Sequence, residues 1–445
     1  MRPDVAASLL AHGLGGRQDL PIPFSYALVG SAATLVVSFL ALGLLVPEPR
    51  LRGERAGRLL PEGLQRVANL PALRRMWRVV GLTLAGYVTL AAVLGPDLAT
   101  NPTAGVVYVL FWVGLVPASL LLGNVWRALN PLRTLHAGLA ALLRVPPERG
   151  LRPLPRRLGY WPAVVGILAF VWLELVAPER TTLPVLRTWL AGYVGVTLIA
   201  AAFYGSRWFD RGDAFEVYSG LLGRFAPVGR RDDGRLVLRS PLDGLAGLRA
   251  APGLVAVICV LLGSTAYDGM SNAPFWVRLQ QTSALPPVVT GTLGLVGVTG
   301  LVLAAYVGAT RAAAAGGQGP PARELPGAFA HALAPIALGY LVAHYYSLFV
   351  LEGQRTISYL SDPLGTGADW LGMAERRVDS SLVTPSGVAT LQVAAVLAGH
   401  VLGVVLAHDR AMRLFPRRHA LAGQLPLLAV MVAYTLAGLL LLFAG

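Results

Sequence analysis

The chain has 445 residues, of which 55% are hydrophobic and only 13% charged, and its formal net charge is +14. A soluble domain carries about 25% charged residues, so this chain has too few charges to cover a water-facing surface, and we predict a polytopic membrane protein. All basic residues are arginines, and they lie between apolar stretches, which excludes nucleic-acid binding as the reason for the positive charge. The single cysteine, Cys259, excludes an intrachain disulfide and a cysteine-based metal site.

Ten stretches are long and apolar enough to cross a bilayer core, which needs roughly 20 residues per helix. They are 26–46, 79–95, 105–123, 160–177, 186–204, 251–268, 287–309, 327–350, 388–407 and 425–444. Strands of a β-barrel would instead alternate apolar and polar residues over about 10 residues. The sequence therefore predicts an all-α bundle of about ten transmembrane helices, with helices 1–5 in 26–204 and helices 6–10 in 251–445.

The arginines are distributed unevenly between alternate loops. Of the 37, 29 lie in 47–78, 124–159, 205–250, 310–326 and 408–424. Because loops rich in arginine stay in the cytoplasm, we predict a bacterial inner-membrane protein with both termini outside. Residues 1–25 lack the charged start and short apolar core of a cleaved signal peptide, so we expect an extracytoplasmic tail and a retained first helix.

The predicted cytoplasmic segment 205–250 has the clearest local structure. Apolar residues at spacings of three and four in 213–225 predict an amphipathic helix at the membrane surface. Asp233-Gly234 between the short apolar runs 227–231 and 235–239 predicts a small β-hairpin. The arginines of 47–78 are read as a topology signal, with binding of a partner protein or anionic lipid as the alternative.

One predicted extracytoplasmic loop, 351–386, is unusually long. Loops beyond about 15 residues are usually functional or disordered. Pro363-Leu364-Gly365-Thr366-Gly367 predicts a fixed turn in it, and Trp370 predicts packing onto the membrane domain. We therefore expect an ordered lid.

Ionisable residues inside apolar spans are energetically costly and point to a functional site. Glu174 and His344 fall in the outward thirds of the fourth and eighth spans, Asp268 closes the sixth span at the same side, and His400 lies deeper. We predict His344 as a metal ligand or base, with Glu174 and Asp268 as acids or ligands. Each of these residues also has a structural interpretation: Glu174 paired with Arg180 or Arg187, His344 and His400 bonded between helices, Asp268 at a helix end.

A hydrolytic zinc site needs three protein ligands and a water. His12 in the tail, His344 and Glu352 are the candidate metal ligands, with Asp19 closing the pocket. The chain has no HExxH, CxxC or close His-x-His pairing. A divalent metal such as zinc is therefore predicted from the depth at which these residues should lie in the membrane, and not from a motif.

Four segments carry a resemblance to a family of polytopic bacterial membrane proteins, many of them labelled fenitrothion hydrolase. These segments are His12-Gly13-Leu14-Gly15-Gly16-Arg17-Gln18-Asp19-Leu20-Pro21-Ile22-Pro23, Asp213-Ala214-Phe215-Glu216-Val217-Tyr218, Asp233-Gly234-Arg235-Leu236-Val237-Leu238-Arg239 and Ser361-Asp362-Pro363-Leu364-Gly365. The resemblance implies hydrolysis of a phosphotriester, an apolar small molecule that partitions into lipid.

Three functions therefore stay open at this point. The first is a membrane-bound hydrolase, or a subunit of one, with its site around His344 at the outer face. The second is a secondary transporter coupled to protons through Glu174 or His400, which an inverted repeat of five and five helices would favour, although no matching motifs relate 1–204 to 251–445. The third is a non-catalytic scaffold subunit whose arginine-rich loops hold a partner in a membrane complex.

Overall fold

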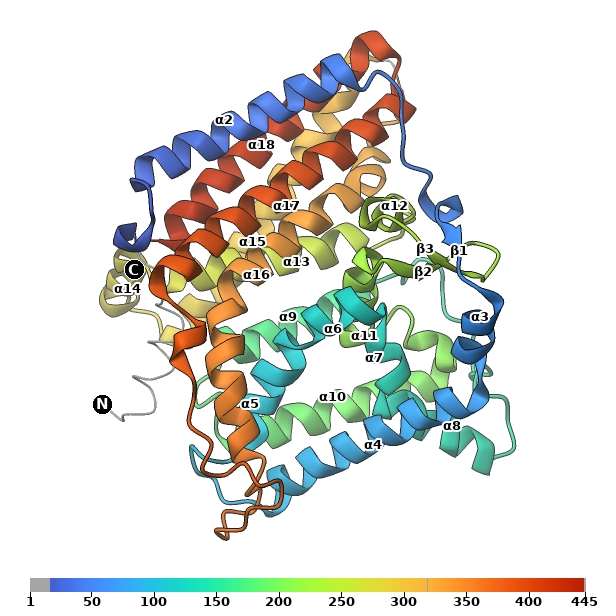
Figure 1. Ribbon diagram of the computed structural model, residues 1–445, viewed down its shortest axis with the longest axis vertical. Helices are drawn as coiled ribbons and strands as arrows, with labels where there is room; N and C mark the ends of the chain where they lie inside the picture. Colours follow the sequence, from blue (N-terminus) through green and yellow to red (C-terminus); the bar gives the residue numbers. More distant parts are fainter. Residues whose placement is uncertain (1–16, 318, 444–445) are drawn as a thin grey trace. The chain divides into compact units, whose positions relative to one another are not determined.

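The computed structural model describes residues 17–317 and 319–443, which are mostly helical (Figure 1). Within these residues, nine helices are long and apolar enough to cross a membrane. They are α2 (Phe24–Leu45), α4 (Pro71–Leu94), the interrupted helix Pro102–Leu122, α10 (Leu183–Tyr204), α13 (Leu254–Ser271), α15 (Pro287–Ala312), α16 (Leu325–Tyr359), α17 (Pro385–Leu414) and α18 (Arg417–Leu442). These helices identify the chain as a multi-pass membrane protein in contact with lipid.

Two of the predicted spans differ from uninterrupted transmembrane helices. The predicted span 160–177 is the shorter apolar helix α9 (Trp161–Leu175), so the described residues contain nine long helices where ten were expected. The helix Pro102–Leu122 consists of α5 (Pro102–Gly105), the π-helix η3 (Val106–Val113) and α6 (Leu115–Leu122). Asn101 caps its start, because its side chain accepts a hydrogen bond from the backbone N–H of Thr103 at 3.0 Å.

Contacts divide the helices into two compact units, and the division differs from the order of the chain. Among the described residues, unit 1 comprises 55–244 and 348–380, and unit 2 comprises 17–54, 245–347 and 381–443. The first long helix, α2, thus belongs to unit 2 with the last ones. The contacts therefore group helices that are far apart in the chain.

Unit 2 is held together by helices that run alongside one another (Figure 1). One stripe of α2, formed by Ala27, Ser31, Leu35 and Phe39, is buried at a spacing of four residues, and α2 contacts α17 and α18. Between α16 and α17, backbone meets backbone: a Cβ at Gly399 would lie 2.5 Å from the carbonyl oxygen of Pro335. Small residues permit such close approach of membrane helices.

Unit 1 has a short buried helix, α11 (Ala214–Leu222), among its longer ones. It contacts α6, α9 and the short helix α7 (Val125–Leu129). Asp213 caps its start by accepting the backbone N–H of Glu216 at 2.8 Å. Every residue of α11 except Gly220 is buried. The helix forms where the sequence predicts it, but its polar residues Glu216 and Ser219 are covered by α6 and α7 and do not face water. Its place at the membrane surface stays a prediction.

The sheet of unit 1 has three short antiparallel strands in the order β1-β3-β2. β2 (Val228–Arg230) and β3 (Leu236–Leu238) are joined by a turn through Asp233 and Gly234, where Gly234 has φ +80°. β1 (Arg58–Leu59) pairs with the other edge of β3. This third strand comes from the arginine-rich segment 47–78, for which the sequence predicted no strand.

The remaining elements are short. They are η1 (Arg17–Asp19), η2 (Gly53–Arg55), α3 (Glu62–Asn69), α8 (Pro131–Leu142), η4 (Ser206–Trp208), η5 (Gly223–Phe225), α12 (Pro241–Ala246), α14 (Pro274–Thr282), η6 (Ala313–Gly316) and η7 (Ser380–Leu382).

The segment 351–386 is part helix and part ordered loop. α16 continues to Tyr359, so Glu352 is helical and not in a loop as the sequence suggested. Beyond the helix, the Asp362 carboxylate accepts the backbone N–H groups of Thr366 at 2.9 Å and Gly367 at 2.7 Å. The ring of Trp370 packs edge-on against Tyr87 of α4, at 6.1 Å between centroids. Short polar side chains that bond to nearby backbone hold such a loop in one conformation.

Candidate functional site

His344 and Asp268 form a buried pair inside unit 2. Nε2 of His344 on α16 lies 2.5 Å from Oδ2 of Asp268 on α13. Their side chains are 10% and 9% exposed. α13 is buried along almost its whole length up to Asp268, so the carboxylate is held in place by the helix that carries it. Two predicted site residues, 76 positions apart in the chain, are thus brought together in the structure.

The other predicted site residues do not join this pair within unit 2. Glu174 lies on α9 in unit 1. Glu352 lies on the part of α16 that belongs to unit 1, and its carboxylate binds Arg355 at 2.7 and 2.9 Å. His12 lies outside the described residues, and Asp19 is in η1 of unit 2.

The predicted zinc site has no counterpart in the part of the chain that the structure describes. No group of three or more His, Cys, Asp or Glu side chains in 17–317 and 319–443 could hold a metal ion. The ligand set His12, His344 and Glu352 combines one residue outside this range with residues of two different units.

A second buried histidine in unit 2, His400, lies between two tyrosines. Its ring is 5.8 Å from that of Tyr340 on α16 and 6.2 Å from that of Tyr434 on α18, centroid to centroid. Nδ1 of His400 lies 2.9 Å from the carbonyl oxygen of Val396, so Nδ1 carries the hydrogen. Nε2 is then an acceptor, and it has no hydrogen-bond partner among the described residues. His400 is fully buried, as a structural interpretation predicts.

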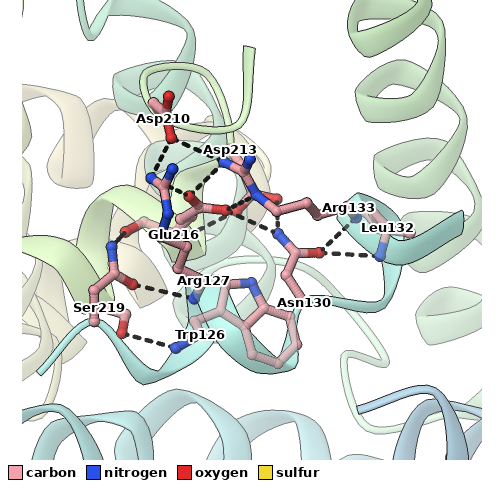
Figure 2. A network of polar contacts seen from close by, with 10 residues as sticks. Trp126, Arg127, Asn130, Leu132, Arg133, Asp210, Asp213, Glu216 and Ser219 are labelled. Carbon is pink, nitrogen blue, oxygen red and sulfur yellow. Dashed lines mark hydrogen bonds and ion pairs between the residues drawn. The ribbon is translucent and has the colours of Figure 1, made fainter. Parts of the chain in front are cut away.

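Unit 1 contains a larger polar network, which the sequence analysis did not identify (Figure 2). Arg133 donates to both Glu216 oxygens, at 3.0 and 2.6 Å, and to Asp210 at 2.9 Å. Arg127 binds Asp210 and lies 3.4 Å from Glu216. Asn130 donates to Asp213 at 3.1 Å and to Glu216 at 3.3 Å. The network connects the start of α11 to α7 and α8.

Burial and ion pairing together set the protonation of two residues in this network. Burial raises the pKa of Asp213 to about 6, and the hydrogen bond from the Glu216 N–H opposes the increase. Burial lowers the pKa of Arg133, but hydrogen bonds and charges from Glu216 and Asp210 outweigh this effect and raise the pKa overall. Arg133 is therefore charged, whereas Asp213 exchanges a proton near pH 6.

The sequence does hold a signal for this network. Arg127, Asn130 and Arg133 are spaced by three residues, and so are their partners Asp210, Asp213 and Glu216. Residues three apart lie on one face of a helix or helical turn, so each set presents a line of complementary groups. The sequence pattern places Asp213 and Glu216 in a helix, but the pattern of one helix does not indicate that Arg127, Asn130 and Arg133 pair with it.

Comparisons of the chain with protein-family models, with curated proteins and with solved structures find no match. The resemblance to fenitrothion hydrolases thus depends on the four sequence segments quoted above.

Proposed function

We propose that the protein is a proton-coupled secondary transporter in which Asp268 and His344 bind and release the coupling proton. The observation that carries this proposal is the pair itself, with its 2.5 Å contact and nearly complete burial between two apolar helices. Ionisable residues inside membrane spans mark proton and substrate pathways in pumps and transporters. Such a pair can exist as a carboxylate with an imidazolium, or lose the proton to water at one membrane face.

His400 and the neighbouring Tyr340 and Tyr434 support a route for the proton beyond the pair of Asp268 and His344. Tyr340 is one helical turn from His344 on α16, which is about 6 Å along the axis at 1.5 Å per residue. The hydroxyl groups of Tyr340 and Tyr434 both donate to backbone carbonyls, those of Tyr434 and Leu262. The buried Nε2 acceptor of His400 is therefore free to receive a hydrogen bond from a water molecule.

The backbone of α16 supports movement of this helix during transport. Pro335 has no N–H, so the helix lacks the bond from residue 335 to the carbonyl of His331. The same proline lies at the close contact with Gly399. A helix weakened at one point, and packed on its neighbour through small residues, is suited to the sliding motions by which transporters change access.

The predicted hydrolase would use the same two side chains in another way. Asp268 would orient His344, and His344 would act as a general base on a water, as a carboxylate and histidine do in hydrolases. The 2.5 Å contact favours this candidate over the scaffold function, which needs no such pair. Under either proposal, the arginine-rich loops face the cytoplasm of a bacterial inner membrane and the pair lies toward the outside.

The transport proposal is tested by proton flux into liposomes that contain the purified protein. Vesicles loaded with the pH dye pyranine receive a potassium gradient and valinomycin, and the initial rate of internal pH change is measured. Asp268→Asn and His344→Gln are expected to lower the rate about tenfold or more, because proton transfer by a positioned group contributes at least this much. Glu324→Gln, at a solvent-exposed carboxylate 58% exposed in unit 2, is the matched control and keeps the parent rate.

The assay supplies no transported substrate and therefore measures proton conduction through the pair. Two results would contradict this conduction: a parent rate equal to that of protein-free vesicles, and an unchanged rate in Asp268→Asn. The same vesicles, supplied with a phosphotriester such as fenitrothion, test the hydrolase candidate through release of the phenol. Phenol release that disappears in His344→Gln, without proton flux, would assign the pair to hydrolysis.

A further inference from the structure

α3 is an exposed helix that is held in a fixed orientation. Gln65 binds β3 twice: its Nε2 donates to the Leu236 carbonyl at 2.7 Å, and its Oε1 accepts the Leu236 N–H at 2.9 Å. One turn later, Asn69 accepts a hydrogen bond from Arg230 of β2 at 2.9 Å. Because Gln65 and Asn69 are four residues apart, these bonds fasten one face of α3 to the sheet and prevent its rotation.

The opposite face of α3 is apolar and open. Leu64 and Val67 are three residues apart, on the side away from Gln65, and are 53% and 52% exposed. No residue of α3 is buried. Apolar residues that a sheet holds outward on a helix next to a membrane span are placed to enter a lipid surface.

The residues that follow α3 indicate which kind of partner this face binds. α3 is followed, after Leu70, by the first turns of the long apolar helix α4. Arg74 and Arg75 are exposed on these turns, beside exposed Met76 and Val79. Apolar side chains beside arginines at the end of a membrane span match the boundary between phospholipid headgroups and acyl chains.

We propose that α3 is an in-plane membrane anchor that binds anionic phospholipids. Leu64 and Val67 enter the acyl boundary, and Arg74 and Arg75 bind the lipid phosphates as charge-assisted hydrogen-bond donors. The sheet sets the angle of the anchor through Gln65, so the β-sheet of unit 1 has a function that the sequence alone did not indicate. This inference is independent of the proposed transport.

The test labels one introduced cysteine at a time, which is possible because the chain has a single cysteine to remove. In a Cys259→Ser background, Val67→Cys and Arg66→Cys place an environment-sensitive fluorophore on two faces of α3, about 100° apart. The purified protein is reconstituted in vesicles of phosphatidylglycerol or phosphatidylcholine that contain a spin-labelled lipid quencher. We expect lipid quenching of the Val67 probe to exceed that of the Arg66 probe about threefold.

The charge on the lipid is tested by removing the arginines. Arg74→Gln with Arg75→Gln is expected to reduce quenching of the Val67 probe in phosphatidylglycerol about twofold and to leave it unchanged in phosphatidylcholine. Arg156→Gln with Arg157→Gln, at two exposed arginines elsewhere in unit 1, is the matched control and keeps the parent quenching. Equal lipid quenching at positions 66 and 67 would overturn the anchor. Protection of the Val67 probe from both lipid and aqueous iodide would also overturn it, by showing that protein covers this face.

Discussion

Glu216 is expected to contribute far more to stability than Asp210, although both bind the same two arginines. The Glu216 side chain is 1% exposed, whereas that of Asp210 is 37% exposed. Glu216→Gln removes the charge that Arg133 binds with two hydrogen bonds, and it places an amide N–H₂ against the guanidinium. Breaking a buried ion pair by removing one partner costs about 3–5 kcal/mol, whereas a half-exposed pair contributes about 1 kcal/mol or less.

Thermal unfolding in detergent, followed by tryptophan fluorescence, measures the difference. For a unit of about this size, 1 kcal/mol corresponds to roughly 2–4 °C in Tm. Glu216→Gln should therefore lower Tm by roughly 6–20 °C and Asp210→Asn by less than about 4 °C. A double-mutant cycle of Arg133 with Glu216 should give a larger coupling energy than one of Arg127 with Asp210. Equal Tm shifts for the two single variants would refute the reasoning from burial.

Two further predictions concern unit 1. Because burial raises the pKa of Asp213 from 3.8 to about 6, the folded state favours the protonated form. The contribution of Asp213 to the free energy of unfolding is complete below about pH 4 and decreases by about 3 kcal/mol as the pH rises through 6. Tm of the parent protein should therefore decrease from pH 4 to pH 8. The decrease should be smaller in Asp213→Asn. In α4, a Cβ at Gly81 would lie 1.8 Å from the Leu129 carbonyl oxygen, whereas Gly86 has no atom within 4 Å. Gly81→Ala should therefore lower the free energy of unfolding by about 3 kcal/mol or more. Gly86→Ala should leave Tm unchanged or raise it. A larger decrease in Tm for Gly86→Ala than for Gly81→Ala would contradict the packing described for α4.

The apolar helices could be predicted from the sequence because a bilayer imposes their length and composition. The ends of these helices were harder to predict, because a helix continues beyond its apolar stretch until its backbone hydrogen bonds end or a capping residue stops it. α4 begins at Pro71, eight residues before the predicted span, among arginines that the apolar criterion excluded. α16 continues to Tyr359 and includes Glu352, which hydropathy assigned to a loop.

The pairing of side chains was only partly predictable. His344 and Asp268 were expected at the same depth, and the structure brings them into contact. Glu174 was expected at that depth too, but depth says nothing about which helices are neighbours, and α9 packs in unit 1. The sequence pattern of α11 predicts that its polar face meets water, because the pattern of one helix does not reveal that α7 presents Arg127 to Glu216.

The burial of α2 against α17 and α18 has a consequence for synthesis. Leu45 and Leu442, the ends of the first and last of these helices, are 397 residues apart. At about 5–20 residues per second, a ribosome needs roughly 20–80 s to make the chain between them. Throughout that interval the stripe with Ser31 and Phe39 lacks its final neighbours, so the nascent chain has to wait in the bilayer, or beside an insertase, before α2 can pack against α17 and α18.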